Sequence, residues 1–127
     1  HWDEPIQVIA HPQPERGLRR YLRQRPLPSA MIIGSTVLAE TFLRLAPELH
    51  LRLPDDLSVA AACNVGQQCC ADIEPHLTCI RPNLERVAEC SLELLARMIA
   101  GDPYPPPIRL PHIIIHSDSI GPPPSEG

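Results

Sequence analysis

The sequence lacks the residue patterns on which most enzymes and metal proteins depend. It has no Cys-x-x-Cys pair, no cysteine and histidine set with zinc spacing, and no glycine-rich phosphate loop. Cys63 is not expected to act as a nucleophile, because no base is paired with it and no basic residue nearby could activate it. The sequence therefore predicts no enzyme, no metal site and no cofactor.

Positive charge and long apolar runs are also scarce. The formal net charge of −4 argues against this segment gripping a nucleic-acid backbone, which needs a basic surface, so any DNA contact must come from elsewhere. No apolar stretch is long enough to cross a membrane, and no signal peptide is present. These absences favour a cytoplasmic protein.

The cysteines do not form an evident disulfide framework. Their number is odd, and the apolar runs make covalent staples unnecessary, so buried reduced thiols are expected. The five positions are Cys63, Cys69, Cys70, Cys79 and Cys90.

What the chain does contain is an alternation of strand and helix patterns. A Pro-Asp-Asp turn leads into residues 57–63, an uncharged apolar run typical of a strand buried on both faces in a parallel sheet. The remaining strands are expected at 6–10, 30–33, 75–82 and 108–116, and helices at 15–25, 37–46 and 84–100. Four arginines on one face of the first helix indicate a solvated face. The chain is predicted to be α/β.

Polar side chains follow two of these strands at the point where each strand ends. Ser35 and Thr36 separate the strand at 30–33 from the next helix, and Cys63 and Asn64 follow the buried strand. In an open parallel sheet such exits share one edge, where ligands bind. Ser35 and Thr36 are equally suited to cap the helix. The sequence leaves both roles open.

The order and the amino-acid sequences of these segments resemble the effector-binding domain of the LacI/GalR family of bacterial transcription regulators. The resemblance lies in the runs PSAMIIGSTVLA (28–39), LRLPDDLSV (51–59) and PHLTCIRP (75–82), in the helix at 84–100, and in the ending at 110–122. It covers about four-fifths of the chain in unbroken order. It implies one parallel-sheet lobe of a periplasmic-binding-protein-like (type I) fold, with three α/β/α layers.

The resemblance also implies a domain organisation. Residues 1–120 correspond to the carboxyl-terminal part of the effector-binding domain, and 121–127 to a flexible tail. We expect the chain to be a fragment that lacks an amino-terminal lobe and a helix-turn-helix domain. The helix at 84–100 would belong to that other lobe, so its apolar face should lack most of its partners here.

The sequence departs from the family where the ligand is usually held. Ser35-Thr36 stands where the family usually has Asn-Asp, and Cys63-Asn64 stands where it usually has an Asp pair. Without these carboxylates, tight recognition of an ordinary neutral sugar through the usual contacts is not expected. Two alternatives stay open: the effector, a sugar or related metabolite, differs from the usual one, or the pocket has lost its ligand. The candidate effector contacts are Ser35, Thr36, Cys63 and Asn64, with Gln13 as a weaker addition. Aromatics for stacking on a sugar are also few.

The resemblance implies a ligand-sensing and dimerising domain of a regulator. A small-molecule effector between two lobes would modulate operator binding, with DNA held by a domain outside this chain. The homodimer contact would involve the helix at 37–46 and the loop at 66–72. The alternative is a secreted solute-binding protein that feeds a transporter; the five cysteines count against that oxidising compartment.

Overall fold

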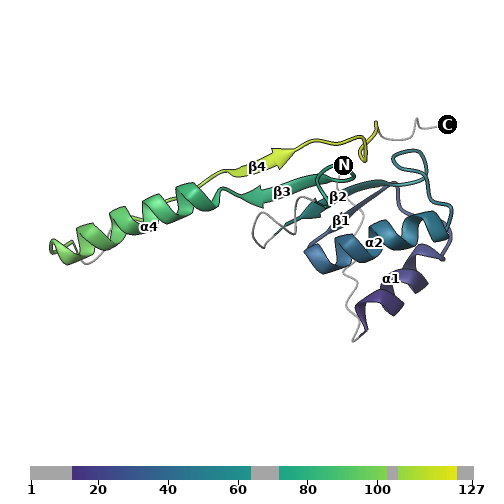
Figure 1. Cartoon of the computed structure of the whole chain (residues 1–127), viewed down its shortest axis with the longest axis horizontal. Coiled ribbons are helices and arrows are strands. Elements are labelled where there is room, and N and C mark those ends of the chain that lie inside the picture. The colour runs from purple at the N-terminus through teal and green to yellow at the C-terminus, as the bar shows by residue number, and fades with distance from the viewer. Residues whose placement is uncertain (1–12, 64–71, 103–105, 123–127) are drawn as a thin grey trace.

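The computed structural model describes residues 13–63, 72–102 and 106–122 (Figure 1). Its elements follow in the order α1 (Pro14–Leu22), β1 (Ala30–Ile33), α2 (Thr36–Glu48), β2 (Ser58–Ala62), β3 (Thr78–Pro82), α4 (Leu84–Ile99) and β4 (His112–Ile115). The sequence predicted each of them, although the predicted final strand is shorter in the structure. The strand predicted at 6–10 and candidate contact Asn64 lie outside the described residues.

The four strands form one sheet in the order β1-β2-β3-β4. β1 pairs with β2 and β2 with β3 in parallel, as the α/β prediction requires, whereas β4 is antiparallel to β3. The sheet is therefore mixed rather than purely parallel. The reason is that the chain leaves β3 into α4 and returns directly alongside β3, so the returning strand runs the opposite way (Figure 1).

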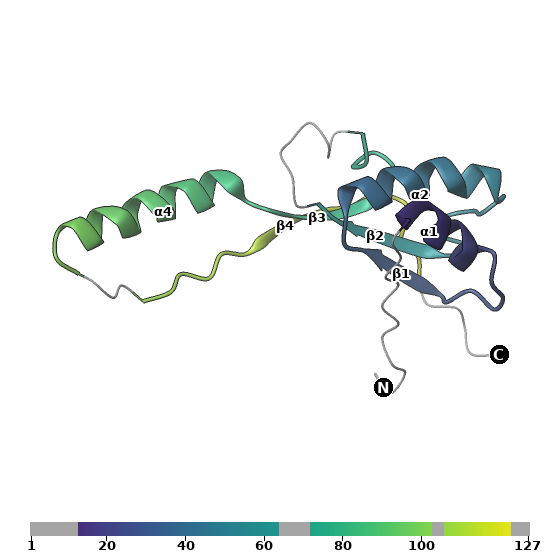
Figure 2. The ribbon, with the colours of Figure 1, turned by 90° about the horizontal axis from the view of Figure 1, so that it is seen from below.

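Helices α1 and α2 cover one face of the sheet (Figure 2). The core lies between them and the strands and includes three fully buried side chains from three elements, Phe42, Val59 and Cys79. Ile32 points away from this core and is 73% exposed. The described residues thus supply the sheet and one helical layer of the expected three-layer arrangement.

Local signals explain where the helices begin and end. The Asn83 side chain accepts a hydrogen bond from the Arg86 backbone N–H at 3.1 Å, which confirms the predicted cap of α4. Gly101, at φ +103°, ends the same helix in a conformation that a side chain would strain. α1 ends at Leu22, earlier than the predicted residue 25, since the proline at 26 disfavours helix in the residue before it.

Helix α4 extends away from the sheet (Figures 1 and 2). Cys90 is its buried residue, and its apolar face remains exposed among the described residues. That face comprises Leu84, Val87, Leu92, Leu95, Met98 and Ile99. The exposure of this face among the described residues agrees with the expectation drawn from the resemblance.

Two ion pairs fix α1 against α2. Arg44 donates hydrogen bonds from both Nη atoms to the carboxylate of Glu15, at 3.0 and 3.1 Å. Arg19 donates to Glu48 at 2.8 Å. The Arg44 guanidinium also holds the pKa of Glu15 below its ordinary value. These contacts set the start of α1 beside the second half of α2.

Candidate functional site: the carboxyl edge of the sheet

The exits of β1 and β2 open at the same edge of the sheet. The parallel register pairs Ile33 with Ala61, so the chain leaves β1 towards Ser35 and β2 towards Cys63 at the same edge. Neighbouring strands are about 4.8 Å apart, which brings the two exits together. The sequence prediction of one shared edge is confirmed by this register.

Ser35 occupies the N-cap position of α2 but its side chain makes no capping hydrogen bond. Its backbone is extended (φ −147°, ψ 130°), and its carbonyl oxygen accepts the first helical hydrogen bond, from the Ala39 N–H at 2.9 Å. The side chain is half-buried. Capping, one of the two roles that the sequence left open, therefore does not account for the Ser35 hydroxyl.

Thr36 is the first residue of α2 and is 6% exposed. Its hydroxyl oxygen, Oγ1, is shielded from solvent and has no hydrogen-bond partner in the described part of the chain. Most buried hydroxyls in proteins are hydrogen-bonded, because an unpaired one has given up its contacts with water without replacement. Thr36 is thus a buried polar group that lacks a partner beside the start of a helix.

The other candidate contacts lie in different surroundings. Cys63 is 1% exposed and packs in the core, and its N–H donates to the carbonyl oxygen of Ile80 at 2.8 Å. Gln13 is exposed at the N-cap of α1. The start of α1 is held beside Arg44 of α2 by the ion pair with Glu15. Arg44 is eight residues after Thr36, or about 12 Å further along α2. Ser35, Thr36 and Cys63 share one edge, whereas Gln13 lies further along α2.

The start of α2 carries no negative charge of its own. No acidic residue occurs in its first turn. The side chain of Val37 is 68% exposed, and a Cβ atom added to Gly34 would meet no atom within 4 Å. The first N–H groups of a helix have no partner within the helix and carry partial positive charge. The first turn of α2 is open, has no carboxylate of its own and is suited to a hydrogen-bond acceptor, with exposed Glu40 as the nearest acidic residue along the helix.

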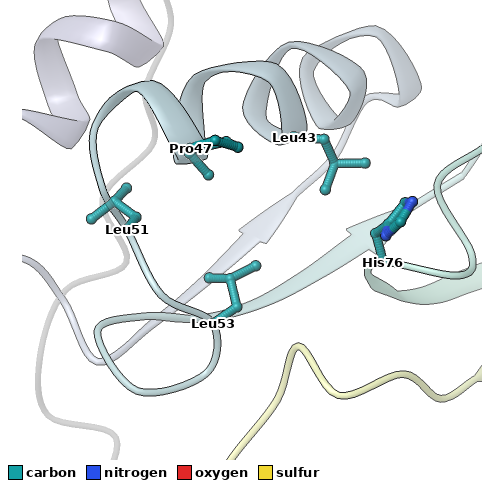
Figure 3. A pocket seen from close by; sticks show the side chains of 6 residues that line it. Leu43, Pro47, Leu51, Leu53 and His76 are labelled. Carbon is teal, nitrogen blue, oxygen red and sulfur yellow. The ribbon is translucent and has the colours of Figure 1, made fainter.

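A separate apolar cavity of about 390 Å³ lies at the other end of α2 (Figure 3). It is lined by Leu43, Ala46, Pro47, Leu51, Leu53 and His76. None of the candidate effector contacts lines it. This cavity was not predicted from the sequence. Its local signal is the pair Leu51 and Leu53, which alternate with polar residues just before the buried strand.

The described residues contain neither a metal-binding cluster nor a membrane-spanning helix. No three histidine, cysteine or acidic side chains there are placed to hold a metal ion. In the same ranges, no helix has the length and apolar character that crossing a membrane requires.

This arrangement defines a class: an α/β lobe in which parallel strands meet the start of a helix at one edge of the sheet. A family model described as a periplasmic binding protein-like domain matches residues 3–119. The chain belongs to this family of periplasmic binding protein-like domains. No curated protein gives a match.

Solved structures of similar fold include two LacI-family proteins. A LacI family transcriptional regulator from Bifidobacterium animalis subsp. lactis has a TM-score of 0.72 at 22% identity, over 86% of this chain and 40% of that one. A LacI regulator from Lactobacillus casei, solved with bound Tris, has a TM-score of 0.62 at 15% identity, over 84% and 37%. An uncharacterised protein from Actinobacillus succinogenes has a TM-score of 0.68 at 22% identity, over 85% and 39%.

These comparisons confirm the fold that the resemblance implied. The chain spans about two fifths of the length of the structures that it matches. Two of the three structures are described as LacI-family regulators, and the matching family model describes a binding-protein domain.

Proposed function

We propose that this chain is the effector-binding and dimerising part of a cytoplasmic, DNA-binding transcription regulator of the LacI/GalR kind. A small-molecule effector binds at the carboxyl edge of the sheet, between this lobe and a second one. Operator DNA is held by a helix-turn-helix domain outside these residues. The effector changes operator affinity through its different affinities for the two lobe arrangements.

The observation that carries the proposal is the start of α2 at the carboxyl edge of parallel strands. Ser35 makes no capping bond there, and Thr36 Oγ1 has no partner in the described ranges. Open α/β sheets bind ligands at this edge, since backbone N–H groups and hydroxyls converge on it. The fold shared with two LacI-family regulators supports a sensing role.

The exposed face of α4 supports a second lobe. Large apolar side chains, such as Ile99 at 79% exposure, line one side of this 16-residue helix. Contiguous apolar faces of this kind are usually covered in the functional protein. In the proposed arrangement an amino-terminal lobe covers α4, and the two segments that join α4 to the sheet connect the lobes.

The proposal includes a homodimer formed through α2 and the loop at 66–72. The loop lies mostly outside the described residues, and the support here comes from the cavity beside α2. Pro47, which lines that cavity, is exposed on the outer side of the helix. An apolar side chain from a second copy would fill this concave surface.

The first test reads the coding DNA for roughly 200 codons upstream of His1, about one lobe and a small DNA-binding module. A helix-turn-helix segment followed by an α/β lobe is the expected result. A signal peptide in that place would overturn the regulator and indicate an exported solute-binding protein.

The dimer is tested separately by sedimentation of Pro47→Glu. We expect this variant to sediment as a monomer, because it puts a charge into the apolar contact. The matched control is Ile32→Glu, the same kind of change at an exposed position of β1 on the opposite side of the sheet, which should leave the dimer intact. If the two variants sediment alike, this surface is not part of the dimer interface.

A further inference from the structure

We infer that the effector presents an oxyanion, a carboxylate or a phosphate group, to the start of α2. This inference rests on the proposed function and adds the chemical class of its ligand. The group would accept hydrogen bonds from the first-turn N–H groups and from the hydroxyls of Ser35 and Thr36. A neutral sugar held through its hydroxyl protons would instead need acceptors at this position.

The start of α2 has backbone N–H donors that no side-chain cap accepts. The N–H groups of Thr36, Val37 and Leu38 occupy the first turn, where no intrahelical partner exists. A side-chain cap would normally accept one of these bonds, and Asn83 does so for α4. Ser35 does not do so for α2. The donors are left for an acceptor that is not part of the helix.

The hydroxyl of Thr36 belongs to the same first turn. It is shielded from solvent and unpaired among the residues that the structure describes, so it has a proton to donate and no acceptor. A bound oxyanion has several lone pairs and can accept from this hydroxyl and from N–H groups together. The same ligand would thus satisfy both features.

The charge around the start of α2 also favours an anion. The positive end of the helix dipole favours an anion, and no carboxylate lies in the first turn to occupy or oppose it. Glu48, the last residue of α2, and Glu15 of α1 are paired with Arg19 and Arg44 at the other end of the helix. Glu40, one turn beyond Thr36, is exposed to solvent. Exposed Val37 and the open space at Gly34 leave room for a ligand.

The test is an NMR titration of the 127-residue chain with inorganic phosphate and with a matched pair of small molecules. Gluconate and glucitol differ in having a carboxylate or a hydroxymethyl group at one end. We expect phosphate and gluconate to cause saturable shifts of the Thr36, Val37 and Leu38 amide signals, and glucitol to cause none. A tenfold or greater preference for gluconate is the predicted result.

Two variants locate the binding at the helix start. Val37→Asp puts a carboxylate in the first turn, where it favours the helix but repels an anion, and should weaken phosphate binding by about tenfold. Val37→Asn has the same shape without the charge and should bind as the parent chain does. Thr36→Val keeps the shape and removes the hydroxyl, and should weaken binding by about fivefold while leaving the fold at least as stable.

The outcomes separate the ligand class from the proposed function. Shifts with glucitol alone would overturn the oxyanion and leave an effector site at this edge. Equal phosphate affinity of Val37→Asp and Val37→Asn would also overturn the oxyanion. If neither phosphate nor gluconate shifts any signal at this edge, the oxyanion is overturned, whereas the proposed function, which includes a second lobe, is decided separately by the upstream coding DNA.

Discussion

Ser119 and Val59 exchange two hydrogen bonds. The Ser119 hydroxyl donates to the Val59 carbonyl oxygen at 2.6 Å, and the Val59 N–H donates to the Ser119 carbonyl oxygen at 2.8 Å. The same hydroxyl oxygen accepts the Thr78 N–H at 2.8 Å. One buried side chain therefore joins the segment after β4 to both β2 and β3. A further bond, from the Gly121 N–H to the Ser58 hydroxyl at 3.1 Å, extends this attachment.

Replacing Ser119 with alanine should lower the free energy of unfolding by about 1–3 kcal/mol, because it leaves buried backbone groups without a partner. Ser119 is 2% exposed, so water cannot replace the lost hydroxyl without rearrangement. Urea unfolding monitored by circular dichroism measures the change. Ser91→Ala is the control, since that exposed hydroxyl donates only to the Val87 carbonyl oxygen within its own helix. A loss at position 119 no larger than at position 91 would contradict the prediction.

His50→Gly should stabilise the chain by about 1 kcal/mol, because His50 has a left-handed backbone (φ 54°) that disfavours any residue with a Cβ atom. The residue follows α2 in a Schellman arrangement, in which the His50 N–H donates to the Pro47 carbonyl oxygen and the Leu51 N–H to that of Ala46.

Thermal unfolding of His50→Gly and His50→Ala separates backbone from side chain. The alanine variant keeps the strain and should unfold near the parent temperature. If alanine stabilises as much as glycine, the imidazole and not the backbone is responsible.

Local signals in the sequence were sufficient to identify the described helices and strands, although not every one of their ends. β1 has the predicted bounds because Ala30–Ile33 is an apolar run between a proline-rich break and a glycine. The start of α4 follows from Asn83, a good cap directly before an amphipathic pattern. These elements are determined by residues close to them in the chain.

Features that depend on distant residues were not predictable in the same way. The antiparallel direction of β4 depends on where α4 returns the chain. The cavity at Pro47 and His76 forms only when two separate segments fold together. Ser35 shows a third limit: its residue type suits a cap and a ligand contact equally, and only the folded chain shows that its side chain makes no capping bond. Residue type gives the capacity for a hydrogen bond, and tertiary structure decides which partner is used.

Acid should destabilise the chain through Glu15 and Asp56. Hydrogen bonds from Arg44 hold the pKa of Glu15 below its ordinary value of 4.5, and those from Arg52 hold the pKa of Asp56 below 3.8. Since both folded-state pKa values are lowered, the stabilisation is present above the ordinary values and is lost as pH falls through the lowered ones.

Unfolding measured from pH 6 to pH 2 in Glu15→Gln and Asp56→Asn tests this linkage. Each variant should lose less stability on acidification than the parent chain, and the double variant should lose least, because the two carboxylates share no partner. If the free energy of unfolding falls equally with pH in the parent chain, both single variants and the double variant, these two carboxylates do not control the acid transition.

The Ser35 and Asn83 side chains should respond differently to removal, although both precede a helix. Asn83→Ala should destabilise α4 by about 1 kcal/mol, because its Oδ1 accepts the Arg86 N–H. Ser35→Ala should change the free energy of unfolding by less than about 0.5 kcal/mol, since no capping bond is lost. Amide hydrogen exchange measures the local stability of α2 and of α4 in one experiment. A loss of about 1 kcal/mol in α2 for Ser35→Ala would mean that this hydroxyl caps the helix in solution, and the argument for a ligand contact at Ser35 would then fall.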